Sequence, residues 1–281
     1  MTQMVVPIDI LVTLNQHYLK PVSVMLVSLF EHNPQQRFRI WLIHEAIPKP
    51  DLQQLQALIA HYQQEFTAIK VDGEQWRQAP TEGRYPIEMY FRLLCGELLP
   101  QSLSRVLYLD PDILVLNSVL PLWQLDLETS TFAAATHTGM TNLVTDLNKL
   151  RLGTDHAYFN SGVMLIDLAR ARQLVHFADI QQVLETKSDY LLLPDQDLLN
   201  YLYGREIKEI PEEIWNYDAR KYAVYFTRSL GKNDLHWIIG QTVFLHFCGQ
   251  PKPWDERHDN RFTALYGNYQ RLTERLLARL A

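Results

Sequence analysis

The first 110 residues alternate between strand-like and helix-like segments, and this alternation restricts the fold more than any other feature of the 281-residue chain. Apolar runs typical of buried strands occupy residues 8–14, 37–44, 66–71 and 105–109, and segments with helical period occupy 18–32, 51–64 and 86–99. A strand that leads through a helix to the next strand favours parallel pairing. The pattern predicts an α/β fold with a mostly parallel, Rossmann-like sheet flanked by helices.

The second half of the chain is less regular and predicts a smaller C-terminal region on the same domain. We expect strands at 131–137, 162–167, 205–211 and 243–247, helices at 168–186 and 195–203, and loops at 138–157 and 211–240. Residues 1–260 contain no repeat and no obvious linker, so we expect one domain over this range.

Residues 261–281 predict a C-terminal helix with an apolar side and a basic side. The apolar side holds Leu272, Leu276, Leu277 and Leu280, and the arginines nearby are Arg271, Arg275 and Arg279. Such a helix either packs back on the domain, which we favour, or touches an anionic membrane surface.

Composition excludes several classes of protein. A net charge of −6 and a pI near 5.9 provide no basic field for a nucleic-acid polymer, so any phosphate binding must be local. The two cysteines, Cys95 and Cys248, form no disulfide framework, which suits a reducing compartment. With no leader-like or membrane-spanning apolar run, we expect a cytoplasmic protein, with peripheral contact at the inner face of the membrane as the alternative.

The stretch VLYLDPDILVLN at 106–117 places two carboxylates between two apolar runs. Asp110 ends a predicted strand, and ligands gather at the carboxyl ends of strands in open α/β sheets. Pro111 restricts the backbone between the two acids. Two close carboxylates repel unless a divalent cation neutralises them, so Asp110 and Asp112 predict a metal site. A surface turn is the competing interpretation of D-P-D.

The segment HFCGQPKPW at 246–254 follows a strand and supplies groups that suit the same site. His246 offers an imidazole nitrogen, which favours Mn²⁺ over Mg²⁺. Gly249 permits close approach of the backbone to a ligand, and Lys252 is a compact charge suited to phosphate. A structural histidine is the alternative.

Three further segments carry candidate polar groups. Asn160 and Ser161, in YFNSGVMLID, can read the hydroxyls of a sugar. The segment LPDQDLLN places Asp195 and Asp197 on either side of Gln196 at a predicted helix start. Helix capping explains one of these acids. Both acids together suit contacts with sugar hydroxyls and with the cation that develops at an anomeric carbon. On the apolar segment 88–94, Arg92 either snorkels or reaches a pyrophosphate or the paired acids.

Together these segments resemble glycosyltransferase family 8, which includes bacterial lipopolysaccharide galactosyl- and glucosyltransferases and, more distantly, glycogenin. The resemblance spans most of the chain, from ILVTLNQHYLKPVSVMLVSL to HFCGQPKPW. It implies a GT-A fold whose C-terminal loops face the acceptor. It also implies Mn²⁺-dependent transfer of a hexose from a UDP-sugar to a glycan or glycolipid, with retention of anomeric configuration.

The resemblance also assigns residues to roles. The metal ligands would be Asp110, Asp112 and His246, and the nucleotide would contact Thr13, Leu14, Asn15, Tyr18, Asp110, Pro111, Gly249 and Lys252. The donor sugar would meet Arg92, Asn160, Ser161, Asp195 and Gln196, with Gln196, Asp195 and Arg92 as the catalytic residues. This chain departs from the family pattern at Asn15, His17 and Pro111.

Two other functions fit parts of the pattern. A haloacid-dehalogenase-type phosphatase also uses Asp-x-Asp at a strand end, but it requires Thr or Val where this chain has Leu114. A non-catalytic protein that binds nucleotide sugars would keep the same pocket without transfer. The sequence leaves open the choice between glucose and galactose, the acceptor and the oligomeric state. It also leaves open whether retention follows a front-side or a double-displacement route, although we expect the Gln196 amide oxygen to stabilise the cation of a front-side route.

Overall fold

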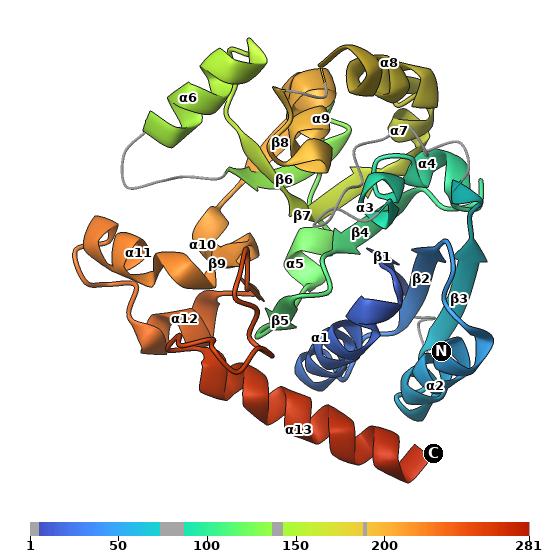
Figure 1. The fold of residues 1–281 in the computed structure, drawn as a ribbon. Coiled ribbons are helices and arrows are strands. Elements are labelled where there is room, and N and C mark those ends of the chain that lie inside the picture. The colour runs from blue at the N-terminus through green and yellow to red at the C-terminus, as the bar shows by residue number, and fades with distance from the viewer. Residues whose placement is uncertain (1–5, 74–86, 137–142, 188–189, 281) are drawn as a thin grey trace.

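The computed structural model describes residues 6–73, 87–136, 143–187 and 190–280. Its main sheet has seven strands in the order β3-β2-β1-β4-β7-β6-β8 (Figure 1). The strands are β1 (Ile8–Thr13), β2 (Phe38–His44), β3 (Glu65–Lys70), β4 (Arg105–Leu109), β6 (Phe132–Thr136), β7 (Phe159–Asp167) and β8 (Ile207–Ile210). Only β7 runs antiparallel to its neighbours among these described strands. The predicted mostly parallel sheet is therefore confirmed.

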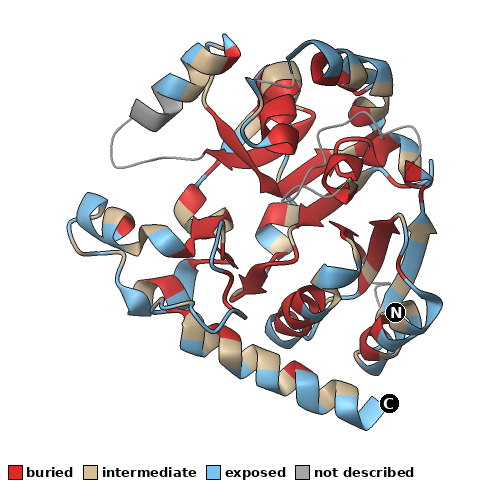
Figure 2. Ribbon diagram, viewed as in Figure 1, coloured by how far each residue is buried: buried red, intermediate tan, exposed pale blue. Residues whose placement is uncertain are grey.

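Helices cover both faces of this sheet, and its central strands are mostly buried (Figure 2). Alternate side chains of these strands belong to two separate cores. On one face, Ile10 and Val12 of β1 pack with α1 (Leu19–His32), and α2 (Lys49–His61) covers the same side. On the other, Leu11 packs in the core of α3 (Glu88–Phe91), α4 (Cys95–Leu98), α7 (Leu168–Leu174), α8 (Phe177–Lys187) and α9 (Pro194–Tyr203).

A second, three-stranded sheet joins one strand from the middle of the chain to two strands of the C-terminal part, and it carries one wall of the site. Its order is β5-β10-β9, from β5 (Ile113–Val115), β10 (Phe244–His246) and β9 (Tyr217–Asp218). Aromatic side chains fill its core, including Tyr217, Tyr225 and Phe247. Around it lie α10 (Glu212–Trp215), α11 (Tyr222–Arg228) and α12 (Leu235–Gln241), and α5 (Leu120–Trp123) follows β5.

The C-terminal helix α13 (Thr263–Leu280) runs along the outside of α1 and α2 (Figure 1). Leu272, Leu276 and Leu277 pack against the core beneath, and Leu280 is 36% exposed. Most of the apolar side of α13 is therefore used within the chain. Within the described residues, no helix combines the length and the apolar character needed to cross a bilayer.

Several predicted boundaries were wrong. The segment predicted as one helix at 168–186 is two, because buried Val175 is extended (φ −97°, ψ 116°) and separates α7 from α8. The predicted helix 86–99 is described from residue 87 as α3 and α4, joined by a turn. The predicted loop at 138–157 contains α6 (Leu143–Leu152), and residues 137–142 lie outside the described residues. The predicted loop at 211–240 contains α10, α11 and α12.

Candidate active site

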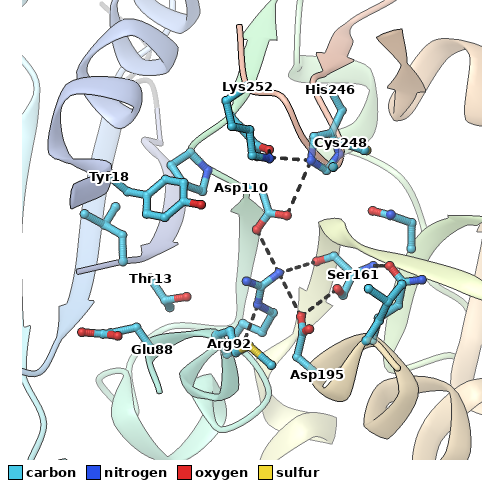
Figure 3. A pocket seen from close by; sticks show the side chains of 18 of the residues that line it. Thr13, Tyr18, Glu88, Arg92, Asp110, Ser161, Asp195, His246, Cys248 and Lys252 are labelled. Carbon is cyan, nitrogen blue, oxygen red and sulfur yellow. Dashed lines mark hydrogen bonds and ion pairs between the residues drawn. The ribbon is translucent and has the colours of Figure 1, made fainter. Parts of the chain in front are cut away.

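A cavity of about 300 Å³ opens where the carboxyl ends of the parallel strands meet the smaller sheet. Every site residue predicted from the sequence lines it except Asn15: Thr13, Leu14, Tyr18, Arg92, Asp110, Pro111, Asp112, Asn160, Ser161, Asp195, Gln196, His246, Gly249 and Lys252. Segments that are far apart in the sequence thus converge on one hollow (Figure 3).

Strand direction explains this convergence. Thr13 ends β1, and Asp110 directly follows β4, so both lie at the carboxyl edge of the parallel sheet. Because β7 runs antiparallel to β4, its first residues lie at that same edge. Asn160 and Ser161 therefore reach the cavity from inside strand β7, which begins at Phe159, and not from the residues just before a strand at 162–167 as predicted.

The smaller sheet brings His246 to the acids. Strand β10 pairs antiparallel with β5 so that His246 lies opposite Ile113, the residue after Asp112. A hydrogen bond from the Phe247 N–H to the Asp112 carbonyl, 3.0 Å long, extends this pairing into the Asp-Pro-Asp turn. The register of two short strands thus sets the separation of the predicted metal ligands.

The two carboxylates each direct one oxygen toward the imidazole. Nε2 of His246 lies 3.2 Å from Oδ1 of Asp112 and 3.6 Å from Oδ2 of Asp110. The other oxygens are already engaged: Oδ1 of Asp110 accepts from the Tyr108 hydroxyl at 2.6 Å, and Oδ2 of Asp112 contacts the ammonium of Lys252.

These three side chains fit a divalent cation. Their ligand atoms lie within 4.8 Å of one another, the only such cluster found within the described part of the chain. Two carboxylate oxygens and one imidazole nitrogen suit Mn²⁺ better than Mg²⁺, which prefers oxygen ligands alone. Gly162 leaves the room that these side chains occupy, because a Cβ there would lie 2.6 Å from Oδ2 of Asp110 and would overlap His246.

Charge pairing keeps Asp112 ionised although it is buried. Burial acts to raise the pKa of the Asp112 carboxyl, but Lys252 and His246 outweigh it and hold that pKa well below its usual range. Burial likewise acts to lower the pKa of Lys252, and Asp112 reverses the effect so that the pKa is raised. An ionised carboxylate and an ammonium group therefore lie side by side in the cavity.

Arg92 joins Asp110, one of the two predicted metal ligands of the Asp-Pro-Asp turn, to a second polar group. Its Nη1 lies 2.9 Å from Oδ1 of Asp110 and 3.3 Å from Oδ2 of Asp195, as Figure 3 shows. The Ser161 hydroxyl donates to the same Asp195 oxygen at 2.9 Å. Burial raises the pKa of Asp195, and Arg92 opposes that rise. The arginine thus links two acids and does not snorkel to solvent.

The first turn of α9 presents Asp195 and Gln196 to the cavity and turns Asp197 away from it. Asp197 is fully buried and binds Arg151 at 2.6 and 2.9 Å and the Tyr158 hydroxyl at 2.6 Å, so its role is structural. The Gln196 Oε1 accepts from the Ser161 N–H at 3.4 Å, while its buried Nε2 has no hydrogen-bond partner among the described residues. An orphaned donor of this kind indicates a missing polar ligand.

Asn15 has a local role in this structure. Its side chain accepts from the His17 N–H at 3.0 Å at the start of the short helix η1 (Gln16–Tyr18), and it does not line the cavity. Tyr18, at the end of that helix, does line the cavity and meets Trp254 edge to face, with ring centroids 6.1 Å apart.

The sequence prediction missed five lining residues: Glu88, Met89, Leu193, Arg220 and Cys248. Glu88 precedes Arg92 by four residues, a spacing that could have suggested a shared helix face. Arg220 carried no signal because its segment read as a loop. Its guanidinium pairs with Asp218 and lies so close to Gly249 (φ 73°) that a side chain there would overlap it.

The comparison with protein families gives a match over most of the chain. The model of glycosyl transferase family 8 matches residues 9–258. The chain is 26% identical to general stress protein A of Bacillus subtilis (strain 168) over 272 residues, which is 92% of each chain. It is 27% identical to a lipopolysaccharide 1,2-glucosyltransferase of Escherichia coli over 252 residues, 86% of this chain and 72% of the relative.

A solved structure has the same architecture. The galactosyltransferase LgtC, in complex with donor and acceptor sugar analogues, superposes with a TM-score of 0.81 at 26% identity and covers 94% of this chain and 96% of its own. This likeness confirms the predicted GT-A fold.

Proposed function

Because this chain belongs to glycosyl transferase family 8 and is a sugar-transferring enzyme, we propose that it moves a hexose, glucose or galactose, from a UDP-sugar to a glycan or glycolipid acceptor. The observation that carries the proposal is the convergence of Asp110, Asp112 and His246 at one cavity with Lys252 and Gln196. The relatives named for lipopolysaccharide glucosyltransfer and galactosyltransfer support the choice of a hexose.

We assign the cation site to Asp110, Asp112 and His246. A bound Mn²⁺, or Mg²⁺ in its place, would supply Lewis-acid neutralisation of the charge on the departing diphosphate. Lys252, with its ammonium at the edge of this site, binds the same diphosphate, and backbone N–H groups around Gly249 add to the electrostatic stabilisation. Thr13, Leu14 and Tyr18 form the wall that receives the nucleoside.

The donor sugar then lies against the group formed by Arg92, Asn160, Ser161, Asp195 and Gln196. Arg92 holds Asp195 in place, and Asp195 is held again by Ser161, so this carboxylate has a fixed position beneath the ring. The orphaned Nε2 of Gln196 donates to a sugar oxygen. The sequence had suggested the amide oxygen of Gln196 for the cation, but in this structure that oxygen faces the Ser161 N–H.

Retention requires the acceptor to bond the anomeric carbon on the face that UDP leaves. Gln196 is a poor nucleophile, and Asp195 is engaged by Arg92 and Ser161, so we favour a front-side route. In it the bond from the anomeric carbon to the phosphate oxygen breaks, and that oxygen takes the proton of the acceptor hydroxyl as the new bond forms. In this route the residues of the cavity hold the donor and stabilise the charges that develop on the sugar and on the departing diphosphate.

The decisive experiment measures UDP release from UDP-glucose and UDP-galactose with Mn²⁺ and with a chelator. We expect slow release from one donor, dependent on Mn²⁺, and no hydrolysis of a generic phosphate ester. Release that is insensitive to the chelator would contradict the metal assignment, and donor binding without turnover in the presence of candidate glycan acceptors would favour the non-catalytic alternative. We place the reaction in the cytoplasm, with peripheral contact at the inner face of the membrane when the acceptor is a glycolipid.

A further inference from the structure

His246 is held from behind by an asparagine that the sequence pattern did not single out. Nδ1 of His246 lies 2.8 Å from Oδ1 of Asn216, and both side chains are buried, at 3% and 4% exposed. Asn216 follows α10 and precedes β9, the strand that pairs with β10 next to His246. The amide thus contacts the ring nitrogen that faces away from Asp110 and Asp112.

The direction of each hydrogen bond in this group follows from one backbone N–H. The Gly162 N–H can only donate, and it lies 2.8 Å from a side-chain atom of Asn160, so that atom is the oxygen. An atom of Asn216 lies 2.7 Å from the same oxygen and must therefore be its amide nitrogen. The remaining atom of Asn216 is then an oxygen, which accepts, so Nδ1 of His246 must carry a hydrogen. The assignment does not depend on telling amide oxygen from nitrogen by position.

We propose that Asn216 is a positioning residue for the metal site: it fixes the Nδ1–H form of His246 and so presents the bare Nε2 to the cation. This inference rests on the proposed function. A neutral imidazole has one donor and one acceptor nitrogen, and the partner of one sets the role of the other. If Nε2 carried the hydrogen, it would donate to Asp112 and could not bind a cation.

The same hydrogen bonds also show which atom of the Asn160 amide is the oxygen and which is the nitrogen. Its oxygen is used twice, by the Gly162 N–H and by Asn216. The amide nitrogen of Asn160 is therefore the part left for a donor sugar, where it acts as a hydrogen-bond donor. Asn160 thereby connects the sugar side of the cavity to the metal side through Asn216.

The test uses the full chain and Mn²⁺ alone. Free Mn²⁺ is titrated by electron paramagnetic resonance, and pulsed measurements on protein with ¹⁵N-labelled histidine detect a directly bound nitrogen. We expect Asn216→Leu to weaken Mn²⁺ binding by about 10–100-fold and to lose the nitrogen coupling. Asn216→Asp keeps an acceptor for Nδ1–H and should retain the coupling.

Asn33→Leu is the matched control. Asn33 is another buried amide, 4% exposed, which bonds the Leu29 carbonyl and the Val119 N–H at the end of α1. Asn33→Leu should lower the free energy of unfolding but leave the Mn²⁺ affinity unchanged. If Asn33→Leu weakened Mn²⁺ binding as much as Asn216→Leu, the effect would be one of general stability and the inference would fail.

The wild-type chain provides a test that no folding defect can obscure. Long-range ¹H–¹⁵N spectra of the metal-free protein should show a hydrogen on Nδ1 of His246 whether the ring is charged or neutral. An Nδ1 without a hydrogen would overturn the inference while leaving the proposed function standing. Absence of any nitrogen coupling from Mn²⁺-loaded wild type would instead remove the metal assignment, and the inference with it.

Discussion

Arg92 and Asp110 form a largely buried ion pair, with Nη1 of the arginine 2.9 Å from Oδ1 of the aspartate. The same nitrogen lies 3.3 Å from Asp195, so one guanidinium compensates two acids that line the cavity. Its plane also lies over the Tyr108 ring, 4.5 Å from the centroid. Removing one partner of such a group leaves buried charge without compensation.

We therefore expect Arg92→Ala to lower the free energy of unfolding by about 3–5 kcal/mol near neutral pH. This decrease in the free energy of unfolding should become smaller as the pH falls. Burial raises the pKa of Asp195 in the folded state above its value in the unfolded chain, and Arg92 opposes that rise. The cost of the Asp195 charge is therefore absent below the unfolded pKa, grows between the two pKa values and is complete above the folded pKa, and removal of Arg92 enlarges it. Urea unfolding at neutral and mildly acidic pH measures both effects.

An exposed ion pair provides the control for Arg92→Ala. Arg205 and Asp155 are 76% and 73% exposed and 2.8 Å apart. Arg205→Ala should leave the free energy of unfolding almost unchanged, because exposed pairs contribute little. A loss for Arg92→Ala no larger than for Arg205→Ala would show that Arg92 does not compensate the two acids.

Asp112→Asn should reduce Mn²⁺-dependent UDP release to background while the chain stays folded. The substitution removes a proposed anionic metal ligand and the partner of Lys252 without changing the size of the side chain. Circular dichroism checks the fold, and a coupled assay measures UDP. Asp155→Asn, at an exposed acid, should leave release unchanged; near-normal turnover by Asp112→Asn would remove the metal hypothesis.

The sequence predicted the central strands of the main sheet well because their two faces are buried in different cores. In β1, Ile10 and Leu11 both face apolar surroundings, and such a run is distinct from its polar flanks. The sequence could not predict the break between α7 and α8. Ala171, Val175 and Ile180 are all buried, so the helical spacing of apolar residues continues through Val175.

Some residues of the candidate site could likewise be predicted from the sequence and others could not. Asp110, Asp112 and His246 belong to compact motifs that can be recognised in the chain. Asn216 belongs to a segment with no motif, and its relation to His246 exists only because β9 and β10 pair in space. Residues that act through another residue, and not on the ligand itself, leave little trace in a single sequence.

Lys252→Ala should weaken UDP binding by about 1.5–3 kcal/mol, the range of a charge-assisted hydrogen bond. Lys252 is 9% exposed, contacts Asp112 and donates to the Phe247 carbonyl at 3.1 Å, so its ammonium has a fixed position. Calorimetry with UDP and Mn²⁺ measures the change. Lys208→Ala, at a lysine that contacts Glu128 away from the cavity, serves as control, and equal UDP affinity in the two variants would exclude the phosphate role.

Gly162→Ala should abolish Mn²⁺ binding and transfer. Its Cβ would lie 2.6 Å from Oδ2 of Asp110 and overlap the imidazole of His246, so two of the three proposed ligands would have to move. Manganese titration by electron paramagnetic resonance measures the loss.

Gly240→Ala is the matched control for Gly162→Ala because no atom lies within 4 Å of the position that its Cβ would take. Gly240 lies in α12, where alanine should raise the free energy of unfolding by about 0.5–1 kcal/mol and leave Mn²⁺ affinity unchanged. Wild-type Mn²⁺ affinity in Gly162→Ala would mean that the side chains of Asp110 and His246 adjust freely. In that case the distance between His246 and the two aspartates, which the pairing of β5 with β10 sets, would not determine cation binding.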